Sequence, residues 1–568
     1  MHAKISRILR SINPLRGLRR AFHSLGNGWR RRHRGLDGIV FTLPAELPAL
    51  PETRGWLRRR ILGAPPLSLA ELDEHFEQIG ADPRTRVVVL HLRGLALSLA
   101  DLQTLRASVL RLRQRGRRVI CYAQDYDNAT YYLAAACDEI VLQPGGGLAA
   151  LGLVARPTFL KHTLDSLGIE LDVVAITPFK GALDALARAT ISPEAQQQLD
   201  WLLDSRYDML LAGIADGRRI TPEDARALVD GGPYTAQAAL AANCVDAVLN
   251  EEALPAHLGL EKLIPWEQAA PRLFRRWRAS AAGGYVAVLP LTGMIMQGES
   301  AEPPGGLPLP LPLLDEGRMG DLTVVRQARN LLRDEQAKAV VLWIDSGGGS
   351  AAASEAMAAA LDELARDRPL VAYFNAVAAS GGYYIATPAR WIVAQPGTVT
   401  GSIGVVLAKA VTRGLFERLR ANRIELTRGA NAGLFSDGAP FTDAQRAIMR
   451  QGIEETYRLF VERVAASRGL TLEAVDAVGG GRVWTGQQAL ERGLVDELGD
   501  LRAAVAKARA LAGLPQNAPA YLVQGPGQPL GPQARQAADP AAGLRHAAAV
   551  FEAFTGGRAL FLLPFRWK

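Results

Sequence analysis

The chain carries one series of sequence blocks twice, in the same order and with nearly the same spacing. Leu342 stands in the second series where Leu90 stands in the first, and Ser380 stands where Asn128 does. The matched blocks are residues 88–93 and 340–345, 128–134 and 380–386, 140–145 and 392–397, and 234–240 and 484–490. Four blocks in one order indicate an internal duplication, so a single arrangement of elements has to account for both halves.

Each copy alternates short apolar runs, typical of buried strands, with alanine- and leucine-rich segments, typical of helices. The alternation predicts an α/β fold, repeated as two tandem domains. We place the first domain at residues 36–258 and the second at 284–512, with residues 259–283 as the linker. Residues 513–568 are predicted to form a tail whose apolar end, Leu560–Phe565, docks on a neighbouring surface; a membrane contact is the alternative.

The formal net charge of +8 comes from the N-terminus, because residues 1–34 hold ten Lys and Arg and no acidic residue. Apolar residues recur there at helical spacing, so residues 1–35 are predicted to form a basic amphipathic arm that contacts an anionic membrane surface. A disordered tail is the alternative. No second basic cluster accompanies the arm, so nucleic-acid binding is not predicted.

Several classes of protein do not fit this composition. No apolar run is long enough for a transmembrane helix, and the N-terminus lacks the apolar core of a signal peptide. The three cysteines, Cys121, Cys137 and Cys244, cannot make a disulfide framework. Cys137 and Cys244 lie in alanine-rich segments and are expected to be buried structural thiols. No metal site and no cofactor are predicted. The proline-rich residues 303–314 have no partner in the first copy and are expected to form a surface loop.

Ser380 is the candidate nucleophile. It follows an apolar, strand-like run at residues 370–374 and precedes two glycines and an aromatic, helix-like segment. A sharp strand-to-helix turn exposes a hydroxyl near the positive end of a helix dipole, and Gly381 lets a backbone N–H approach an oxyanion. The plain alternative is a serine that caps a helix after a turn.

A second turn, rich in glycine, follows the strand-like residues 340–345. Gly348 and Gly349 at such a turn leave backbone N–H groups free to point at a ligand. A phosphate loop is one alternative, but the turn lacks the P-loop lysine. Two turns that supply N–H donors near one serine fit acyl transfer better.

The base that would activate Ser380 cannot be a nearby histidine, since no histidine lies between residues 258 and 545. Lys180, in the first copy, ends an apolar segment of a chain that uses arginine almost everywhere else. A desolvated lysine can act as a neutral base, whereas arginine cannot release its proton. The alternative is an ordinary surface lysine.

The two copies differ in a complementary way at these positions. The second copy has no lysine at the position of Lys180, and the first copy lacks the serine and the glycine turn. The counterparts are Asn128 for Ser380, Ala96 and Leu97 for Gly348 and Gly349, Ala150 for Ser402, and Ala430 for Lys180. This pattern predicts one site, with the serine and oxyanion turns from the second copy and the base from the first.

These residues resemble signal peptide peptidase A of the long, duplicated type, a family of Ser–Lys peptidases with the Clp-protease/crotonase fold. The matching motifs are residues 177–182, 345–350, 379–383 and 400–404. The resemblance implies that Ser380 is the nucleophile, that Lys180 is the general base and that Ser402 orients the lysine. It also implies an oxyanion hole at Gly381 and the Gly348/Gly349 turn.

The same resemblance implies apolar peptide substrates such as cleaved signal peptides, a homotetramer, and association with the cytoplasmic membrane on a side left open. A cytoplasmic protein is the alternative location. Two other functions remain possible from the residues: a crotonase-type acyl-CoA enzyme, which would need carboxylates at the turn and no Lys180, and a non-catalytic scaffold of the same fold.

Overall fold

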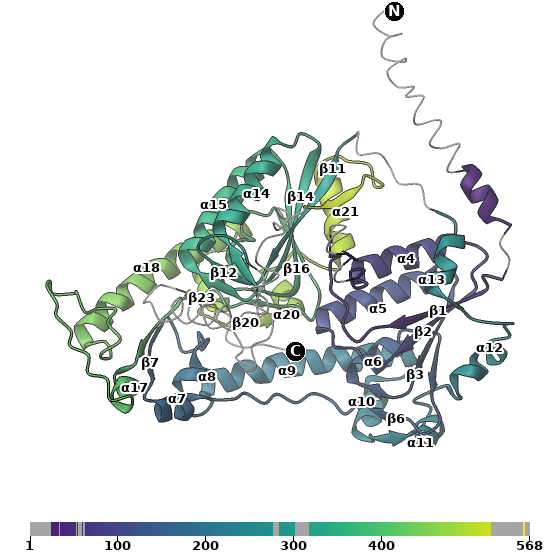
Figure 1. The fold of residues 1–568 in the computed structure, drawn as a ribbon, viewed down its shortest axis with the longest axis horizontal. Coiled ribbons are helices and arrows are strands. Elements are labelled where there is room, and N and C mark those ends of the chain that lie inside the picture. The colour runs from purple at the N-terminus through teal and green to yellow at the C-terminus, as the bar shows by residue number, and fades with distance from the viewer. Residues whose placement is uncertain are drawn as a thin grey trace, which may run out of the picture. The chain divides into compact units, whose positions relative to one another are not determined.

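The computed structural model describes residues 24–32, 35–52, 54, 59–60, 63–275, 283–301, 317–523 and 560–562. Most of the N-terminal arm, the proline-rich loop 303–314, part of the linker and most of the C-terminal tail lie outside these residues. The chain forms two compact units (Figure 1). Unit 1 comprises residues 1–152 and 207–279, and unit 2 comprises residues 153–206 and 280–568.

Unit 1 is built on a six-stranded parallel sheet with the order β10-β1-β2-β3-β5-β9. Its strands are β1 (Gly38–Leu43), β2 (Val87–Leu92), β3 (Arg118–Ala123), β5 (Glu139–Leu142), β9 (Ala247–Val248) and β10 (Ile264–Pro265). All six residues of β2 are buried, which is typical of a parallel strand that is covered on both faces.

The helices of unit 1 cover this sheet. Two of them, α4 (Leu69–Ala81) and α5 (Leu99–Gln114), pack side by side (Figure 1) and begin at Ser68 and Ser98, whose side chains cap the helix N-termini. The others are α6 (Asn128–Ala134), α10 (Pro222–Asp230), α11 (Ala236–Ala241), α12 (Leu254–His257) and α13 (Trp266–Ala269). A small sheet joins β4 (Tyr126–Asp127), β6 (Gly147–Ala149) and β8 (Tyr234–Thr235).

Unit 2 contains the larger sheet, in the order β20-β18-β16-β14-β11-β22, with β17 and β21 joined beside β16. These strands are β11 (Tyr285–Thr292), β14 (Ala337–Ser346), β16 (Leu370–Ala379), β17 (Trp391–Ala394), β18 (Val399–Gly401), β20 (Val483–Thr485), β21 (Glu497–Leu498) and β22 (Ala520–Leu522). Only the β18–β20 pair is antiparallel. The central strands β14 and β16 form the core of the unit together with the helices around them.

The helices of unit 2 include the adjacent pair α14 (Asp321–Arg333) and α15 (Ala351–Asp367) and the long α18 (Asp443–Arg468) (Figure 1). The others are α7 (Lys161–Leu167), α8 (Asp184–Ala187), α16 (Gly381–Tyr384), α17 (Arg413–Arg418), α19 (Leu472–Val478), α20 (Gly486–Glu491) and α21 (Leu501–Leu511). Helix α9 (Pro193–Arg218) begins in unit 2 and ends in unit 1.

A second sheet of unit 2 brings together strands from distant parts of the sequence. Its order is β13-β12-β15-β23-β19-β7. The strands are β7 (Glu170–Ala175), β12 (Met294–Met296), β13 (Arg318–Gly320), β15 (Gly348–Ser350), β19 (Val406–Val411) and β23 (Leu560–Leu562). Strand β7 pairs antiparallel with β19, from Val406↔Ala175 to Val411↔Glu170.

The predicted α/β class is therefore confirmed, and the compact units cut across the two sequence copies. Residues 153–206 belong to the first copy by sequence, yet they pack with the second. The sequence repeat shows which segments were duplicated, whereas the contacts show which segments share a hydrophobic core, and the two divisions of the chain differ. Residues 153–206 include Lys180, so this packing decides where the lysine lies.

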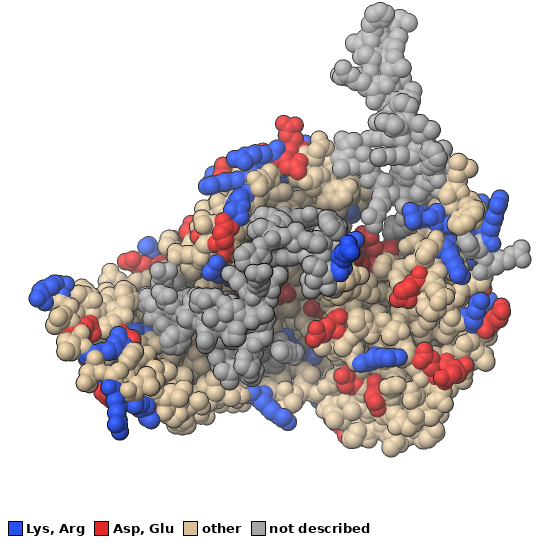
Figure 2. All heavy atoms as spheres, in the orientation of Figure 1, with Lys and Arg blue, Asp and Glu red and all other residues tan. Residues whose placement is uncertain are grey.

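Three further features bear on the sequence predictions. Cys121, Cys137 and Cys244 are buried free thiols. Within the described residues, no helix has the length and apolar character needed to cross a bilayer. On the described part of the face in Figure 2, basic and acidic side chains are interspersed.

Candidate active site

Ser380 lies between the end of β16 and the start of α16, at the predicted strand-to-helix turn. Its backbone has φ 55° and ψ −114°, a conformation that residues other than glycine rarely adopt. The backbone N–H of Ser380 donates to the carbonyl of Gly401 at 2.8 Å, which helps to hold this turn in place. A strained backbone at a buried serine is typical of a functional site.

Lys180 reaches this serine within unit 2. Its Nζ lies 2.7 Å from Ser380 Oγ, 2.8 Å from the Ser402 carbonyl oxygen and 2.9 Å from Ser402 Oγ. A neutral amine can donate two hydrogen bonds to the Ser402 oxygens and accept one from the Ser380 hydroxyl. The structure thus brings together the three side chains that the sequence singled out.

Ser402 follows β18 and also has a positive φ, 51°. Its backbone N–H donates to the carbonyl of Arg482 at 2.6 Å, so the turn that carries Ser402 is bonded to the residue that precedes β20. Both of its oxygens face the Lys180 amine. Ser402 is therefore placed to fix the position of the amine.

The amine and its two serine partners are buried. Lys180 exposes 1% of its surface, and Ser380 and Ser402 expose none. Burial lowers the pKa of Lys180 well below its usual value, because a buried ammonium loses its hydration. The amine is therefore favoured in the neutral form that a base requires.

The glycine turn lies next to Ser380. Strand β14 ends at Ser346, and β15 begins at Gly348, where φ is 103°. A methyl group placed on Gly381 would lie 3.1 Å from the Cα of Gly348, so the two candidate oxyanion segments are in contact. The Gly348 N–H donates to Ser346 Oγ at 3.2 Å. The N–H of Gly381, at the first position of α16, has no acceptor within that helix.

Gly349 also requires the absence of a side chain. Its φ is 152°, and a Cβ there would lie 2.0 Å from the carbonyl oxygen of Ile295 in β12. The turn can therefore approach β12 only with glycine at this position.

In unit 1, Asn128 occupies the place of Ser380, at the start of α6. Its side-chain amide donates to the carbonyl of Gly152 at 2.6 Å and accepts from the N–H of Gly152 at 3.2 Å. Asn128 thus fixes the last residue of unit 1 before the chain enters the segment that carries Lys180. At this position of unit 1 the Asn128 side chain has a structural role, because it bonds the backbone of Gly152.

Residues 479–482, which the comparison of the two copies does not single out, hold the segment that carries Lys180. Thr177 Oγ1 donates to the carbonyl of Gly480, and Arg482 lies over the ring of Phe179, 4.2 Å from its centroid. A Cβ on Gly481 would lie 2.7 Å from the Cα of Lys180. The three successive glycines at 479–481 are visible in the sequence, but nothing there shows which residue they contact.

Tryptophan stacking provides a second anchor for this segment. The rings of Trp201 and Trp484 are stacked with centroids 4.8 Å apart, and Trp201 Nε1 donates to the carbonyl of Val483 at 2.8 Å. Trp201 is in α9, and Trp484 is in β20. Their contact fastens the end of the 153–206 segment to the sheet that carries Ser380.

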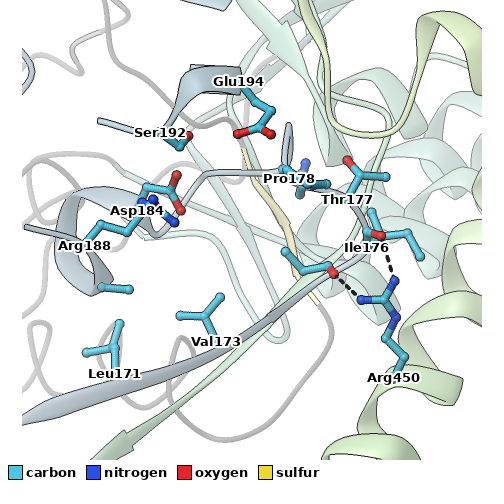
Figure 3. A pocket seen from close by; sticks show the side chains of 13 residues that line it. Leu171, Val173, Ile176, Thr177, Pro178, Asp184, Arg188, Ser192, Glu194 and Arg450 are labelled. Atoms are coloured by element: carbon cyan, nitrogen blue, oxygen red, sulfur yellow. Dashed lines mark hydrogen bonds between the residues drawn. The ribbon is translucent and has the colours of Figure 1, made fainter. Parts of the chain in front are cut away.

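Two arginines of α18 bind the free edge of β7. Arg446 donates to the Val173 carbonyl at 3.1 Å. Arg450 donates to the Ala175 and Ile176 carbonyls at 3.1 and 3.3 Å (Figure 3). The carbonyls that β7 does not share with β19 thus gain charged donors. This arrangement fixes the strand that leads to Lys180.

A pocket of about 650 Å³ borders Lys180 (Figure 3). Leu171, Val173 and Ala175 form an apolar wall along β7, while Asp184, Ser192 and Glu194 lie together on another side. Burial raises the pKa of Asp184. The apolar wall along β7 could take an apolar side chain in this pocket.

Comparison with known proteins identifies the family. Residues 111–262 and 362–515 match peptidase family S49. The chain belongs to peptidase family S49. The match occurs in both halves, which confirms the duplication, and the family makes the protein a serine peptidase.

Two relatives are similar in sequence to this chain over most of its length. The chloroplastic serine protease SPPA of Arabidopsis thaliana is 30% identical over 81% of this chain and 68% of its own length. Protease 4 of Salmonella typhi is 30% identical over 87% of this chain and 81% of its own length. Among solved structures, a membrane-bound stomatin-specific protease, 1510-N, covers 43% of this chain and 99% of its own, with 16% identity and a TM-score of 0.26. The family assignment favours a peptidase over the acyl-CoA enzyme that the residues had left open.

The contact between Gly481 and Lys180 generates a prediction. Gly481→Ala should lower kcat on the order of 10²-fold, because a displacement of about 1 Å in a reacting group can cost that much. Gly480→Ala is the matched control: its φ is also positive, 62°, but the closest atom to its Cβ would be the mobile tip of Arg482, at 3.2 Å. Steady-state kinetics on a soluble peptide, with circular dichroism to verify folding, compare the two. If both variants lost kcat equally, the cause would be backbone strain at a positive φ, and the contact with Lys180 would not explain the loss.

Proposed function

We propose that the protein is a serine endopeptidase with a Ser380–Lys180 dyad. The observation that carries this proposal is the 2.7 Å contact between Lys180 Nζ and Ser380 Oγ inside a fully buried site. Neutral Lys180 removes the proton of the Ser380 hydroxyl as Oγ attacks the scissile carbonyl. The resulting ammonium then protonates the leaving amine, which produces an acyl-enzyme.

Water completes the cycle with a second pair of proton transfers. Lys180, neutral again, removes a proton from water as the water oxygen attacks the acyl carbon. The ammonium then returns this proton to Ser380 Oγ as the carboxyl product leaves, which restores the neutral amine and the free hydroxyl. Ser402 keeps the amine aligned in both steps through its carbonyl and hydroxyl oxygens, at 2.8 and 2.9 Å. Ser402 thus acts as an orienting residue.

The oxyanion of the tetrahedral intermediate would be stabilised by backbone N–H groups of Gly381 and of the Gly348/Gly349 turn. The close approach of Gly381 to Gly348 Cα supports this assignment. The Gly348 N–H must then turn from Ser346 Oγ toward the substrate, and the 3.2 Å length of that bond makes it a weak competitor.

The proposed substrates are apolar peptides, such as cleaved signal peptides. The apolar wall of the pocket beside Lys180 supports this class. Among relatives, a protein of Enterococcus faecium, 32% identical over 30% of this chain, bears the name putative signal peptide peptidase SppA.

A first experiment tests the dyad. Ser380→Ala should abolish cleavage of an apolar fluorogenic peptide. Lys180→Arg should lower kcat by about 10²–10⁴-fold, the usual contribution of a general base. Lys161→Arg makes the same substitution in the same segment, at a partly exposed lysine that pairs with Asp165, and should leave kcat unchanged. Near-normal turnover in Lys180→Arg would refute the assignment of the base, and hydrolysis by Ser380→Ala would refute the nucleophile.

We further propose that the N-terminal arm binds the surface of an anionic membrane and that the protein assembles as a homotetramer. Residues 24–30 are helical, and the side chains of Asn27 and Arg30 bind backbone carbonyls of Arg275 and Pro271 in unit 1. The membrane-binding part should therefore precede residue 24. Light scattering measures the proposed assembly.

Deleting residues 1–23 removes six basic residues and should release the protein from vesicles of anionic lipid, since each contributes on the order of 1 kcal/mol near such a surface. Cleavage of a soluble peptide should continue at the full rate. Vesicle sedimentation at low and high salt, with neutral lipid as the control, measures binding. Full-length protein that stays in the supernatant at low salt would refute the membrane contact.

A further inference from the structure

Strand β23 lies in the second sheet of unit 2 between β15 and β19. It pairs antiparallel with β15, with Gly348↔Leu562, Gly349↔Phe561 and Ser350↔Leu560. On its other edge, Leu560 pairs with Val406 of β19. Residues 560–562 thus complete a sheet whose other strands come from residues 170–411.

The position of β23 coincides with the candidate site. Its pairing partners Gly348 and Gly349 form the candidate oxyanion turn, and β19 begins four residues after Ser402. Its Cα atoms also come within 8 Å of those of α16, the helix that begins directly after Ser380. Neighbouring strands lie about 4.8 Å apart, so the β23 backbone runs alongside the glycine turn.

A peptide bound for cleavage needs the same place. Its scissile carbonyl must lie against the oxyanion turn and within reach of Ser380 Oγ, and an extended peptide gains affinity by adding a strand to a sheet edge. If β23 were absent, the facing edges of β15 and β19 would offer such a strand main-chain partners on both sides. The sequence around β23, Arg-Ala-Leu-Phe-Leu-Leu-Pro-Phe at residues 558–565, is an apolar peptide of the proposed substrate class.

The burial of Ser380 also indicates that part of the structure must move before a substrate binds. Ser380 exposes none of its surface, so a substrate cannot reach its hydroxyl in this arrangement. Something has to move before a peptide can bind, and a three-residue strand held at the end of the chain is a short element to displace.

We propose that residues 560–562 are a tethered pseudo-substrate, which occupies the substrate groove between β15 and β19 and leaves it when a peptide binds. This inference rests on the proposed function of Ser380. It assigns the substrate an extended conformation, antiparallel to Gly348–Ser350, and makes the C-terminus a competitor of the substrate. A tethered competitor raises the apparent KM and leaves kcat unchanged, because saturating substrate displaces it.

The test compares two substitutions at the central residue of β23 in the full-length chain. Phe561→Pro removes the backbone N–H and should expel the strand, whereas Phe561→Ala keeps the backbone able to pair. We expect Phe561→Pro to lower KM for a soluble apolar peptide about tenfold, an affinity change that corresponds to about 1.4 kcal/mol. Its kcat should stay at the wild-type value, and the KM of Phe561→Ala should lie closer to wild type. An unchanged or higher KM in Phe561→Pro would overturn the proposal.

A synthetic peptide of residues 558–565 supplies the second measurement. It should inhibit Phe561→Pro competitively, and inhibit wild type more weakly because the tethered strand already fills the groove; a scrambled peptide should inhibit neither. If Phe561→Pro does not fold, truncation after residue 559 gives the same comparison. Absence of competitive inhibition would also overturn the proposal. Ser380→Ala separates the two ideas, since hydrolysis that requires Ser380 but is insensitive to the tail refutes only the pseudo-substrate.

Discussion

The proposed chemistry of unit 2 depends on the contact between the buried Lys180 amine and the Ser380 hydroxyl. The two residues are 200 positions apart in the sequence, and they meet because residues 153–206 pack with the second copy. Pairing of β7 with β19, stacking of Trp201 on Trp484 and the arginines of α18 each hold part of this segment. Together they place a lysine from one copy beside a serine from the other.

Burying the amine has a consequence for stability. Because burial lowers the pKa of Lys180, the folded protein holds it neutral at pH values where the unfolded chain would protonate it. In that range the unfolded chain binds more protons, so Lys180 disfavours folding at neutral pH, and this cost shrinks as pH rises toward the lysine pKa of the unfolded chain. The surrounding packing must offset this cost. The protein thus keeps a costly buried group whose neutral form suits the proposed chemistry.

Much of the site could be predicted from the sequence, because the duplication supplies an internal comparison. Ser380 and Lys180 stood out since each is missing from the other copy, and Gly348 and Gly349 since alanine and leucine replace them. Gly481 and Trp201 could not be found this way, because their roles come from contacts with residues distant in the sequence. The packing of residues 153–206 with the second copy could not be predicted either. The repeat shows only which blocks of sequence correspond, whereas the packing of this segment follows the pairing of β7 with β19. Strand β23 has only three residues, too few for a periodic pattern, although its apolar character was visible.

The central claim is that a neutral, desolvated Lys180 activates Ser380. The most direct measurement is the rate at which a fluorophosphonate labels Ser380, followed against pH in wild type and in Lys180→Met. Methionine fills a similar volume but offers no basic nitrogen. In wild type the rate should rise through one titration well below the ordinary lysine pKa of about 10.4, and in Lys180→Met it should be nearly zero at every pH. Labelling of Lys180→Met at the wild-type rate, with the same dependence on pH, would contradict the claim.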